Sequence, residues 1–188
     1  MESVPDTSYI ERVQAGEMHC FAPLLERYGR SVYSLIVRVV GNREDAEELT
    51  QDVFLNVYRS LASFQGNSRF STWLYRIAYN AAISAVRKKK YEWPAIEDSM
   101  LEQVAEEDAS DALARESNDE RMARLEAAMQ QLSPDERVLI LFFYRQEKPV
   151  EEIAVIMGLT VSNVKTRLHR IRKKLFVLMT GAKGSNDL

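Results

Sequence analysis

The chain has 188 residues, 46% of them hydrophobic and 28% charged, which is enough apolar material for one ordinary domain or two small ones and excludes a wholly disordered chain. The net charge of −3 conceals an uneven distribution along the chain. Acids crowd residues 91–120, whereas residues 87–90 and 160–175 contain cations and no acid. Two basic segments that flank an acidic one indicate contact with a polyanion at two places.

The N-terminal residues lack the basic and apolar regions of a signal peptide, and no apolar run approaches the about 18 to 20 residues of a membrane span. Cys20 is the only cysteine, which excludes an intramolecular disulfide and a zinc site of several cysteines within one chain. We therefore expect a cytoplasmic protein that is not directly inserted into a membrane.

The first half of the chain contains stretches in which apolar residues recur every three or four positions, the spacing of one buried helix face. Gly41 ends the second stretch, and Asn42 is placed to cap the third. After the loop 63–70, Ser71 or Thr72 opens the fourth stretch, which ends in the basic run. These signals predict helices at residues 7–14, 18–40, 42–61 and 71–90.

Residues 92–119 are rich in acids and have no sustained apolar stripe, so they predict a flexible linker. Helical periodicity resumes at residue 121, with Met122, Leu125, Met129 and Leu132 on one face. Ser133, Pro134 and Glu136 form a strong start signal for the next helix, because the serine and the glutamate can satisfy the free amides of the first turn. Pro149 opens a short helix that Gly158 ends, and Thr160 caps a last helix to about residue 179.

The predicted fold class is all-α, with two small helical domains and an acidic flexible linker between them. The first domain is a four-helix unit at residues 7–91, the linker is at 92–119, and the second domain is a helix-turn-helix unit at 120–180.

The second domain carries the strongest functional signal, in residues 150–174. A short helix, a turn at Gly158 and a cation-rich helix are typical of a helix-turn-helix, whose second helix enters the major groove of DNA. Val164, Leu168, Ile171 and Leu175 form one buried stripe of that helix. The opposite face then carries Ser162, Thr166, His169, Arg170 and Lys173. A solvated cationic face is the ordinary alternative, and the preceding helix, the glycine turn and the lack of acids favour DNA.

A second constellation occupies residues 64–90, where a polar loop leads into a helix with alternating aromatic and cationic residues. Aromatic rings beside phosphate-binding cations suit single-stranded or unpaired DNA. Core aromatics beside surface charges would produce the same pattern. The residues alone leave both interpretations open.

These motifs resemble the extracytoplasmic-function (ECF) sigma factors of bacterial RNA polymerase. DAEELTQDVF at 45–54, FQG at 64–66 and FSTWLYRIAYN at 70–80 are similar to region two of the family. LSPDER at 132–137, EEIA at 151–154 and VKTRLHR at 164–170 are similar to region four. The resemblance extends from about Tyr9 to Leu178 with the motifs in the family's order.

The resemblance implies three sets of site residues. The face that docks on the polymerase core would consist of Glu48, Gln51, Asp52 and Asn56. The minus-ten element, one base of which would be flipped into the loop 65–68, would be bound by Gln65, Asn67, Ser68, Trp73, Arg76, Asn80, Arg87 and Lys88. For the minus-thirty-five element the resemblance implies Lys165, Thr166, His169 and Arg170. The cation-rich helix itself adds Ser162, Arg167, Lys173 and Lys174, the last as a phosphate contact at the flank of the helix.

The expected function is therefore transcription initiation: a DNA-binding sigma factor that recognises and melts promoter DNA. Its expected partners are RNA polymerase core, promoter DNA and an anti-sigma factor, and we expect a monomer when it is free. The alternative from another class is a helix-turn-helix repressor, which would bind duplex DNA without polymerase. A protein-interaction adaptor would leave the all-basic last helix unexplained.

We expect no enzyme activity, cofactor or metal. His19 and Cys20 are adjacent, but the pattern indicates no third partner, so a small buried cysteine is the favoured interpretation. No phosphate-binding glycine loop, zinc spacing or nucleophile elbow is present in the sequence.

Overall fold

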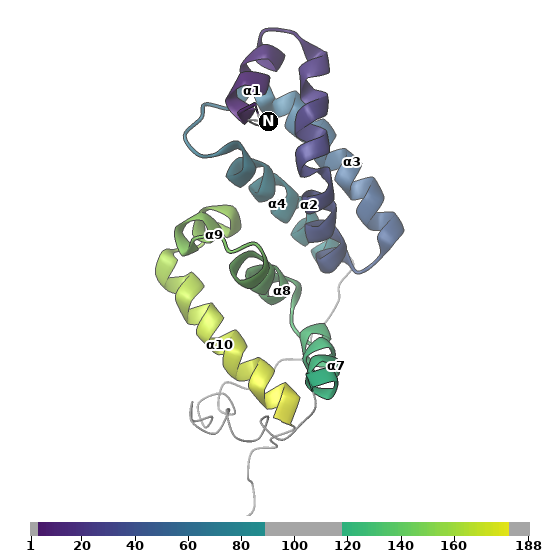
Figure 1. Ribbon diagram of the computed structural model, residues 1–188, viewed down its shortest axis with the longest axis vertical. Helices are drawn as coiled ribbons and strands as arrows, with labels where there is room; N and C mark the ends of the chain where they lie inside the picture. The colour runs from purple at the N-terminus through teal and green to yellow at the C-terminus, as the bar shows by residue number, and fades with distance from the viewer. Residues whose placement is uncertain (1–3, 89–117, 181–188) are drawn as a thin grey trace, which may run out of the picture.

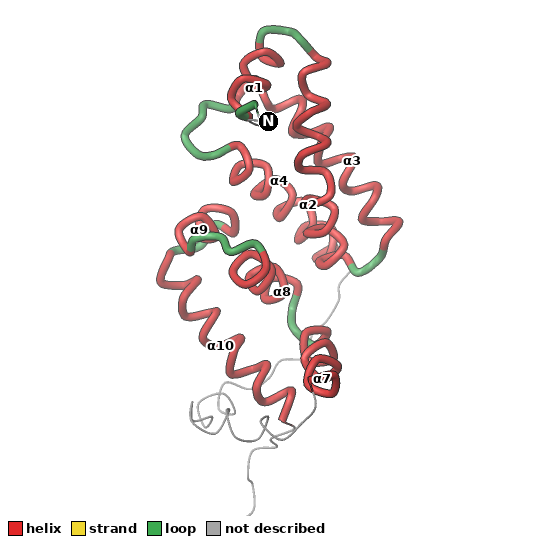
Figure 2. The backbone as a smooth tube through the Cα atoms, viewed as in Figure 1, coloured by secondary structure: helices red, strands yellow, loops and turns green. Residues whose placement is uncertain are grey.

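The computed structural model describes residues 4–88 and 118–180, which form two groups of helices packed against each other (Figure 1). The described parts contain helices and loops and no strand (Figure 2), which confirms the predicted all-α class with two helical domains. The expected linker falls almost wholly on residues outside those described. None of the described helices has the length and apolar composition needed to cross a membrane.

The first group contains α1 (Asp6–Gln14), a 3-10 turn η1 (Met18–Phe21), α2 (Ala22–Val40), α3 (Arg43–Ser60), a 3-10 turn η2 (Leu61–Ser63) and α4 (Phe70–Lys88). The second group contains α7 (Asn118–Gln130), α8 (Pro134–Ile140), a π-helical turn η3 (Leu141–Arg145), α9 (Val150–Met157) and α10 (Val161–Thr180). In the first group, α2 packs against both α3 and α4, and in the second, α10 packs against α7, α8 and α9.

The predicted start and stop signals act as expected where helices meet loops. Gly41 ends α2 in the left-handed conformation with φ of 78°, which a residue without a Cβ adopts without strain. The side-chain oxygen of Asn42 accepts a hydrogen bond from the backbone N–H of Asp45 at 3.1 Å and so caps α3. The end of α2 and the cap of α3 each involve residues a few positions apart, and such local signals can be identified from the sequence.

The prediction of one continuous helix over residues 18–40 is wrong in its first turn. Residues 18–21 form a 3-10 turn, and the α-helix begins only at Ala22 with Pro23 in its first turn. Proline fits there because the amides of a first turn have no partner within the helix. The fourth helix begins at Phe70, slightly earlier than predicted.

The predicted apolar face of α7 also needs correction. Met122 is 57% exposed, whereas Ala128 and Leu132 are buried. Only the C-terminal part of the predicted face is buried, so Met122 belongs to the surface rather than to the core.

The buried residues of the two groups form one continuous apolar cluster, with Leu24, Leu35 and Leu74 in the first group and Phe142 and Ile153 in the second. The two groups meet where α4 packs against α9 and α2 packs against α8. Periodicity within single helices did not predict this contact between the groups.

The start of α8 generates a stability prediction. Ser133 Oγ accepts from the backbone N–H of Glu136 at 3.4 Å, and Glu136 Oε2 accepts from the backbone N–H of Ser133 at 2.7 Å. Ser133→Ala removes one half of this capping box and should lower the free energy of unfolding by about 1 kcal/mol. Urea denaturation of the full chain measures the change. Ser84→Ala, at an exposed position within α4, is the control, and equal midpoints for the two variants would contradict the role of the cap.

Candidate nucleic-acid interface

The helix-turn-helix consists of α9, the turn at Gly158 and α10. Gly158 is left-handed with φ of 67°, and Thr160 Oγ1 accepts from the backbone N–H of Asn163 at 3.1 Å to cap α10. Val164, Leu168 and Ile171 are buried, as the predicted stripe requires. Because these side chains face α8 and α9, the rotation of α10 about its own axis is determined by the core.

The opposite side of α10 is open to solvent and carries the predicted polar residues. Six of them are exposed and Lys173 is partly exposed; the six are Ser162, Lys165, Thr166, Arg167, His169 and Arg170. Hydroxyl, imidazole and guanidinium groups on a face without acids match base edges and phosphates in charge and in hydrogen bonding.

Lys174 does not lie where it was expected. It is only 8% exposed, and its Nζ donates to Glu136 Oε2 at 2.9 Å. Lys174 follows Ile171 by one helical turn, so it faces the start of α8 rather than the solvent. The same glutamate oxygen accepts from the Ser133 amide, so Lys174 joins α10 to the capped end of α8. A lysine held in this way is not a phosphate contact, and we remove it from the candidate site.

The loop between α3 and α4 is supported by an aromatic cluster. The Trp73 ring lies 5.1 Å from the Phe64 ring and 6.0 Å from the Phe70 ring, measured between centroids. Trp73 is therefore half-buried and supports the base of the loop. At the tip, Gln65 and Asn67 are exposed and joined by a hydrogen bond of 3.2 Å, while Ser68 is partly exposed.

The remaining predicted minus-ten residues follow one exposed strip of α4. Arg76, Asn80, Arg87 and Lys88 are all exposed, and the first three return to the same side of the helix, while Lys88 lies on a neighbouring side at its C-terminal end. The loop tip and this strip together place amide and cationic groups beside an aromatic ring, the set of groups that unpaired bases and their phosphates require.

The exposed face of α3 carries the predicted protein-docking residues. Glu48, Gln51, Asp52 and Asn56 are exposed. Leu55 lies among them with 52% of its surface exposed, and the sequence analysis missed it. Its position outside the apolar stripe of α3 was the signal that could have identified it. Glu48 and Asp52 also line an open groove that reaches α4, so this face combines acidic, amide and apolar groups.

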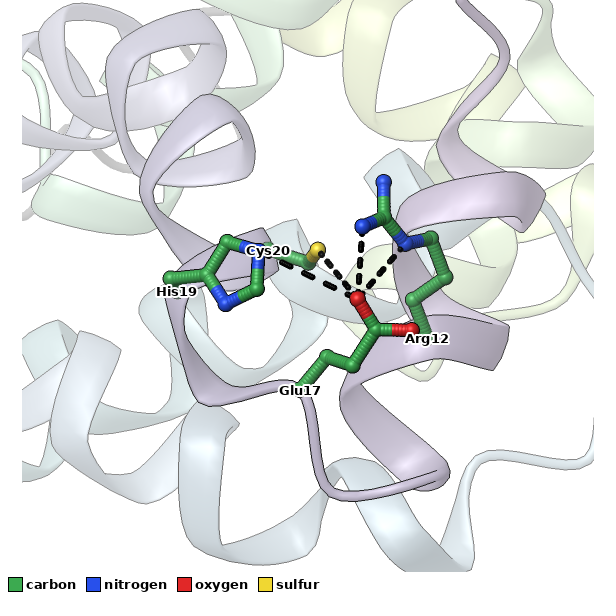
Figure 3. Close-up of polar contacts among 4 residues, drawn as sticks. All are labelled: Arg12, Glu17, His19 and Cys20. Carbon is green, nitrogen blue, oxygen red and sulfur yellow. Dashed lines mark hydrogen bonds and ion pairs between the residues drawn. The ribbon is translucent and has the colours of Figure 1, made fainter.

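A separate polar cluster joins α1 to the turn η1 (Figure 3). Glu17 Oε2 accepts two hydrogen bonds from Arg12 at 3.0 and 2.5 Å, and it lies 3.8 Å from Cys20 Sγ and 3.9 Å from His19 Nε2. The hydrogen bond from Arg12 lowers the pKa of the Glu17 carboxyl. Although glutamate, histidine and cysteine can bind metals, the guanidinium already neutralises the one carboxylate here. The contacts account for the cluster as a junction between α1 and η1.

The position of Lys174 generates a second stability prediction. Lys174→Met leaves Glu136 without its cation and should lower the free energy of unfolding by about 1.5 to 3 kcal/mol. Lys165→Met is the matched control on the exposed side of the same helix, and its effect should stay within about 0.5 kcal/mol. Thermal and urea unfolding of both variants provide the measurement. If the two variants are equally stable, the buried ion pair does not anchor α10.

Comparison with known proteins matches a different family to each of the two groups of helices. The Sigma-70 region 2 family matches residues 24–91, and the Sigma-70, region 4 family matches residues 122–175. The chain is 32% identical over 178 residues to the ECF RNA polymerase sigma factor SigW of Bacillus subtilis, covering 88% of this chain and 92% of the relative. It is 34% identical over 181 residues to the ECF RNA polymerase sigma-E factor of Escherichia coli, covering 93% of this chain and 94% of the relative.

Two solved structures share the fold. CnrH, in complex with the cytosolic domain of CnrY, is similar with a TM-score of 0.65 and 21% identity, covering 93% of this chain and 97% of that chain. The sigma factor RpoE of Bartonella quintana, in complex with the anti-sigma factor NepR, is similar with a TM-score of 0.61 and 22% identity, covering 87% and 98%. The family matches and the relatives together show that this chain belongs to the ECF family of RNA polymerase sigma factors.

Proposed function

We propose that this chain binds RNA polymerase core and directs it to promoters by reading two DNA elements, in the cytoplasm and without catalytic activity of its own. The outward face of α10 carries this proposal, because it combines cations with hydrogen-bonding groups and contains no acid. Residues 7–91 would act on the minus-ten element and on core, and residues 120–180 on the minus-thirty-five element.

The minus-thirty-five element would be read by α10 in the major groove. The buried stripe turns Thr166, His169 and Arg170 outward, and side chains of these types contact base edges. Lys165, Arg167 and Lys173, together with Ser162, would hold the phosphates on either side. Phosphate contacts position the helix, while the base contacts select the sequence.

The minus-ten element would be held by the loop 65–68 and the exposed strip of α4. Extruding a base from the stack costs a few kcal/mol, which contacts to the flipped base must offset. Gln65 and Asn67 offer amide donors and acceptors at the exposed loop tip. Asn80 would help separate the strands, Arg76 would contact the displaced strand, and Arg87 and Lys88 would bind phosphates farther along α4.

The polymerase core would dock on the exposed face of α3, through Glu48, Gln51, Asp52 and Asn56. Leu55 would add an apolar contact at the centre of this face, where burial contributes most to the stability of an interface. An anti-sigma factor is the proposed regulator, because the Bartonella sigma factor with the same fold was solved in complex with one.

Reconstituted transcription tests this function against a helix-turn-helix repressor. Purified chain and core polymerase are combined with a library of promoter fragments, and transcripts are sequenced. Start sites that require the chain and share two upstream elements would support the proposal. Specific binding to duplex DNA without polymerase, and no chain-dependent transcripts, would favour the repressor.

Charge reversal tests the docking face of α3. Asp52→Lys should weaken the complex with core polymerase by at least about tenfold. If cations of the polymerase face Asp52, the new lysine would repel them, and repulsion between like charges lowers affinity more than the loss of one contact does. Glu11→Lys, an equal reversal at an exposed position of α1, should leave the affinity unchanged. Titration with fluorescently labelled core measures both. Equal affinities would exclude this face.

Arg170 should select sequence rather than merely add affinity. An arginine that donates two hydrogen bonds to one guanine contributes about 1 to 3 kcal/mol to discrimination. Arg170→Ala should therefore flatten the preference at one position of the minus-thirty-five element. Lys173→Ala should weaken all promoters alike and reduce the salt dependence, as loss of a phosphate contact does. A uniform effect of Arg170→Ala in the promoter library would show that its assignment is wrong.

A further inference from the structure

The short helix α1 packs on the turn η2 and lies beside the loop that would receive the flipped base (Figure 1). Gln14, the last residue of α1, donates from its side-chain amide to the backbone oxygen of Leu61 at 2.9 Å and to that of Phe64 at 3.3 Å. Leu61 begins η2, and Phe64 directly precedes the loop 65–68. One amide group of α1 therefore holds the backbone where the chain enters this loop.

The other end of α1 acts on the point where the chain leaves the loop. The side chain of Asp6, the first residue of α1, accepts a hydrogen bond from the hydroxyl of Tyr28 in α2. The Tyr28 ring meets the Phe70 ring edge to face, with 5.6 Å between the centroids. Phe70 is 4% exposed and begins α4 just after the loop. The two ends of α1 are thus connected to the two ends of the loop.

The entry and the exit of the loop also contact each other. The Phe64 and Phe70 rings lie edge to face with 5.9 Å between the centroids, which closes the base of the loop. Gln65 and Asn67 at its tip are exposed. A short loop whose tip is not buried takes its conformation mainly from the contacts that hold its ends. The placement of the tip beside α4 therefore depends on the contacts at the base.

Helix α1 is itself anchored independently of the loop. Ile10 is 4% exposed and belongs to the apolar core. Arg12 donates two hydrogen bonds to Glu17 (Figure 3), which ties the C-terminal turn of α1 to the segment before η1. Gln14, by contrast, is exposed. Its amide is therefore presented by a fixed helix, and its replacement opens no cavity in the core.

A loop that is already ordered makes the capture of a base more favourable. A base that leaves the stack loses its stacking and pairing, and its contacts with the protein must compensate for that loss. Ordering a loose loop at the same time would subtract further free energy from these contacts. A loop held at both ends avoids this cost. It also presents the amides of Gln65 and Asn67 in one arrangement, as discrimination between bases requires.

We propose that α1 is a positioning element for the loop 65–68: Gln14 fixes the entry of the loop, and Asp6 fixes its exit through Tyr28. This inference rests on the proposed function. The three residues lie outside the proposed DNA-binding and core-binding surfaces. They act through the loop, and they determine how strongly it discriminates between bases of the minus-ten element.

Gln14→Met tests the entry contact, because methionine has a similar length and no hydrogen-bond donor. The full-length variant is combined with core polymerase and the promoter library. Its preference should fall by about fivefold, the equivalent of about 1 kcal/mol, at the minus-ten position where the wild-type chain discriminates most strongly. Preferences at the minus-thirty-five element and the affinity for core should stay unchanged, because Gln14 belongs to neither surface.

Tyr28→Phe tests the exit contact and serves as the second variant if Gln14→Met does not fold. It keeps the ring that meets Phe70 and removes the hydroxyl that donates to Asp6. The preference should fall at the same minus-ten position. Gln131→Met is the matched control, an equal substitution at an exposed position of the second group, and it should retain the wild-type preference.

The pattern of losses separates positioning from a general structural role. Loss of preference confined to the minus-ten element would support the inference. An unchanged minus-ten preference in both variants would overturn it. An equal loss at every promoter position, accompanied by weaker binding to core, would also overturn it, because that is the result of a destabilised fold. Failure of the proposed function would appear separately, as the absence of transcripts that depend on the wild-type chain.

Discussion

Helix α4 packs against helices of both groups, and this double packing fixes the arrangement of the described residues. One side of the helix carries Leu74 and Ala78, which are fully buried against the first group, and a neighbouring side carries Tyr75 and Tyr79, which the second group covers. What remains for solvent is a narrow strip with Arg76 and other polar residues. The same helix therefore holds the two groups together and carries the exposed strip that we propose binds the minus-ten element.

The orientation of α10 depends on both apolar and polar contacts. Val164, Leu168 and Ile171 hold one side of the helix in the core, and the ion pair between Lys174 and Glu136 ties its C-terminal half to the capped start of α8. Breaking this pair would leave the buried Lys174 charge without its partner, which is costly, so the pair opposes rotation of α10 away from α8. The outward face is therefore presented in one orientation, as recognition of base edges requires.

The charges of this protein are distributed unevenly along the chain, so the charge of one surface can differ in sign from the net charge. A net charge of −3 would disfavour DNA at long range, but the acids crowd residues 91–120 and none occurs in residues 160–175. Within about one Debye length, about 8 Å at physiological salt, a phosphate near α10 encounters mainly cations. The local charge of a surface, rather than the charge of the chain, determines which partner it can approach.

Caps and periodicity depend on residues within a turn or two of each other, and they were therefore enough to predict the all-α class, several helix ends and the outward face of α10. The burial of Lys174, the exposure of Met122 and the contact of Tyr75 and Tyr79 with the second group are visible only once the helices are packed together. Lys174 and Tyr79 are buried by neighbours distant in the chain, Glu136 and Asp135. The periodicity of apolar residues shows that a helix has a buried side. It does not show which element covers that side, or whether a second element covers another side of the same helix.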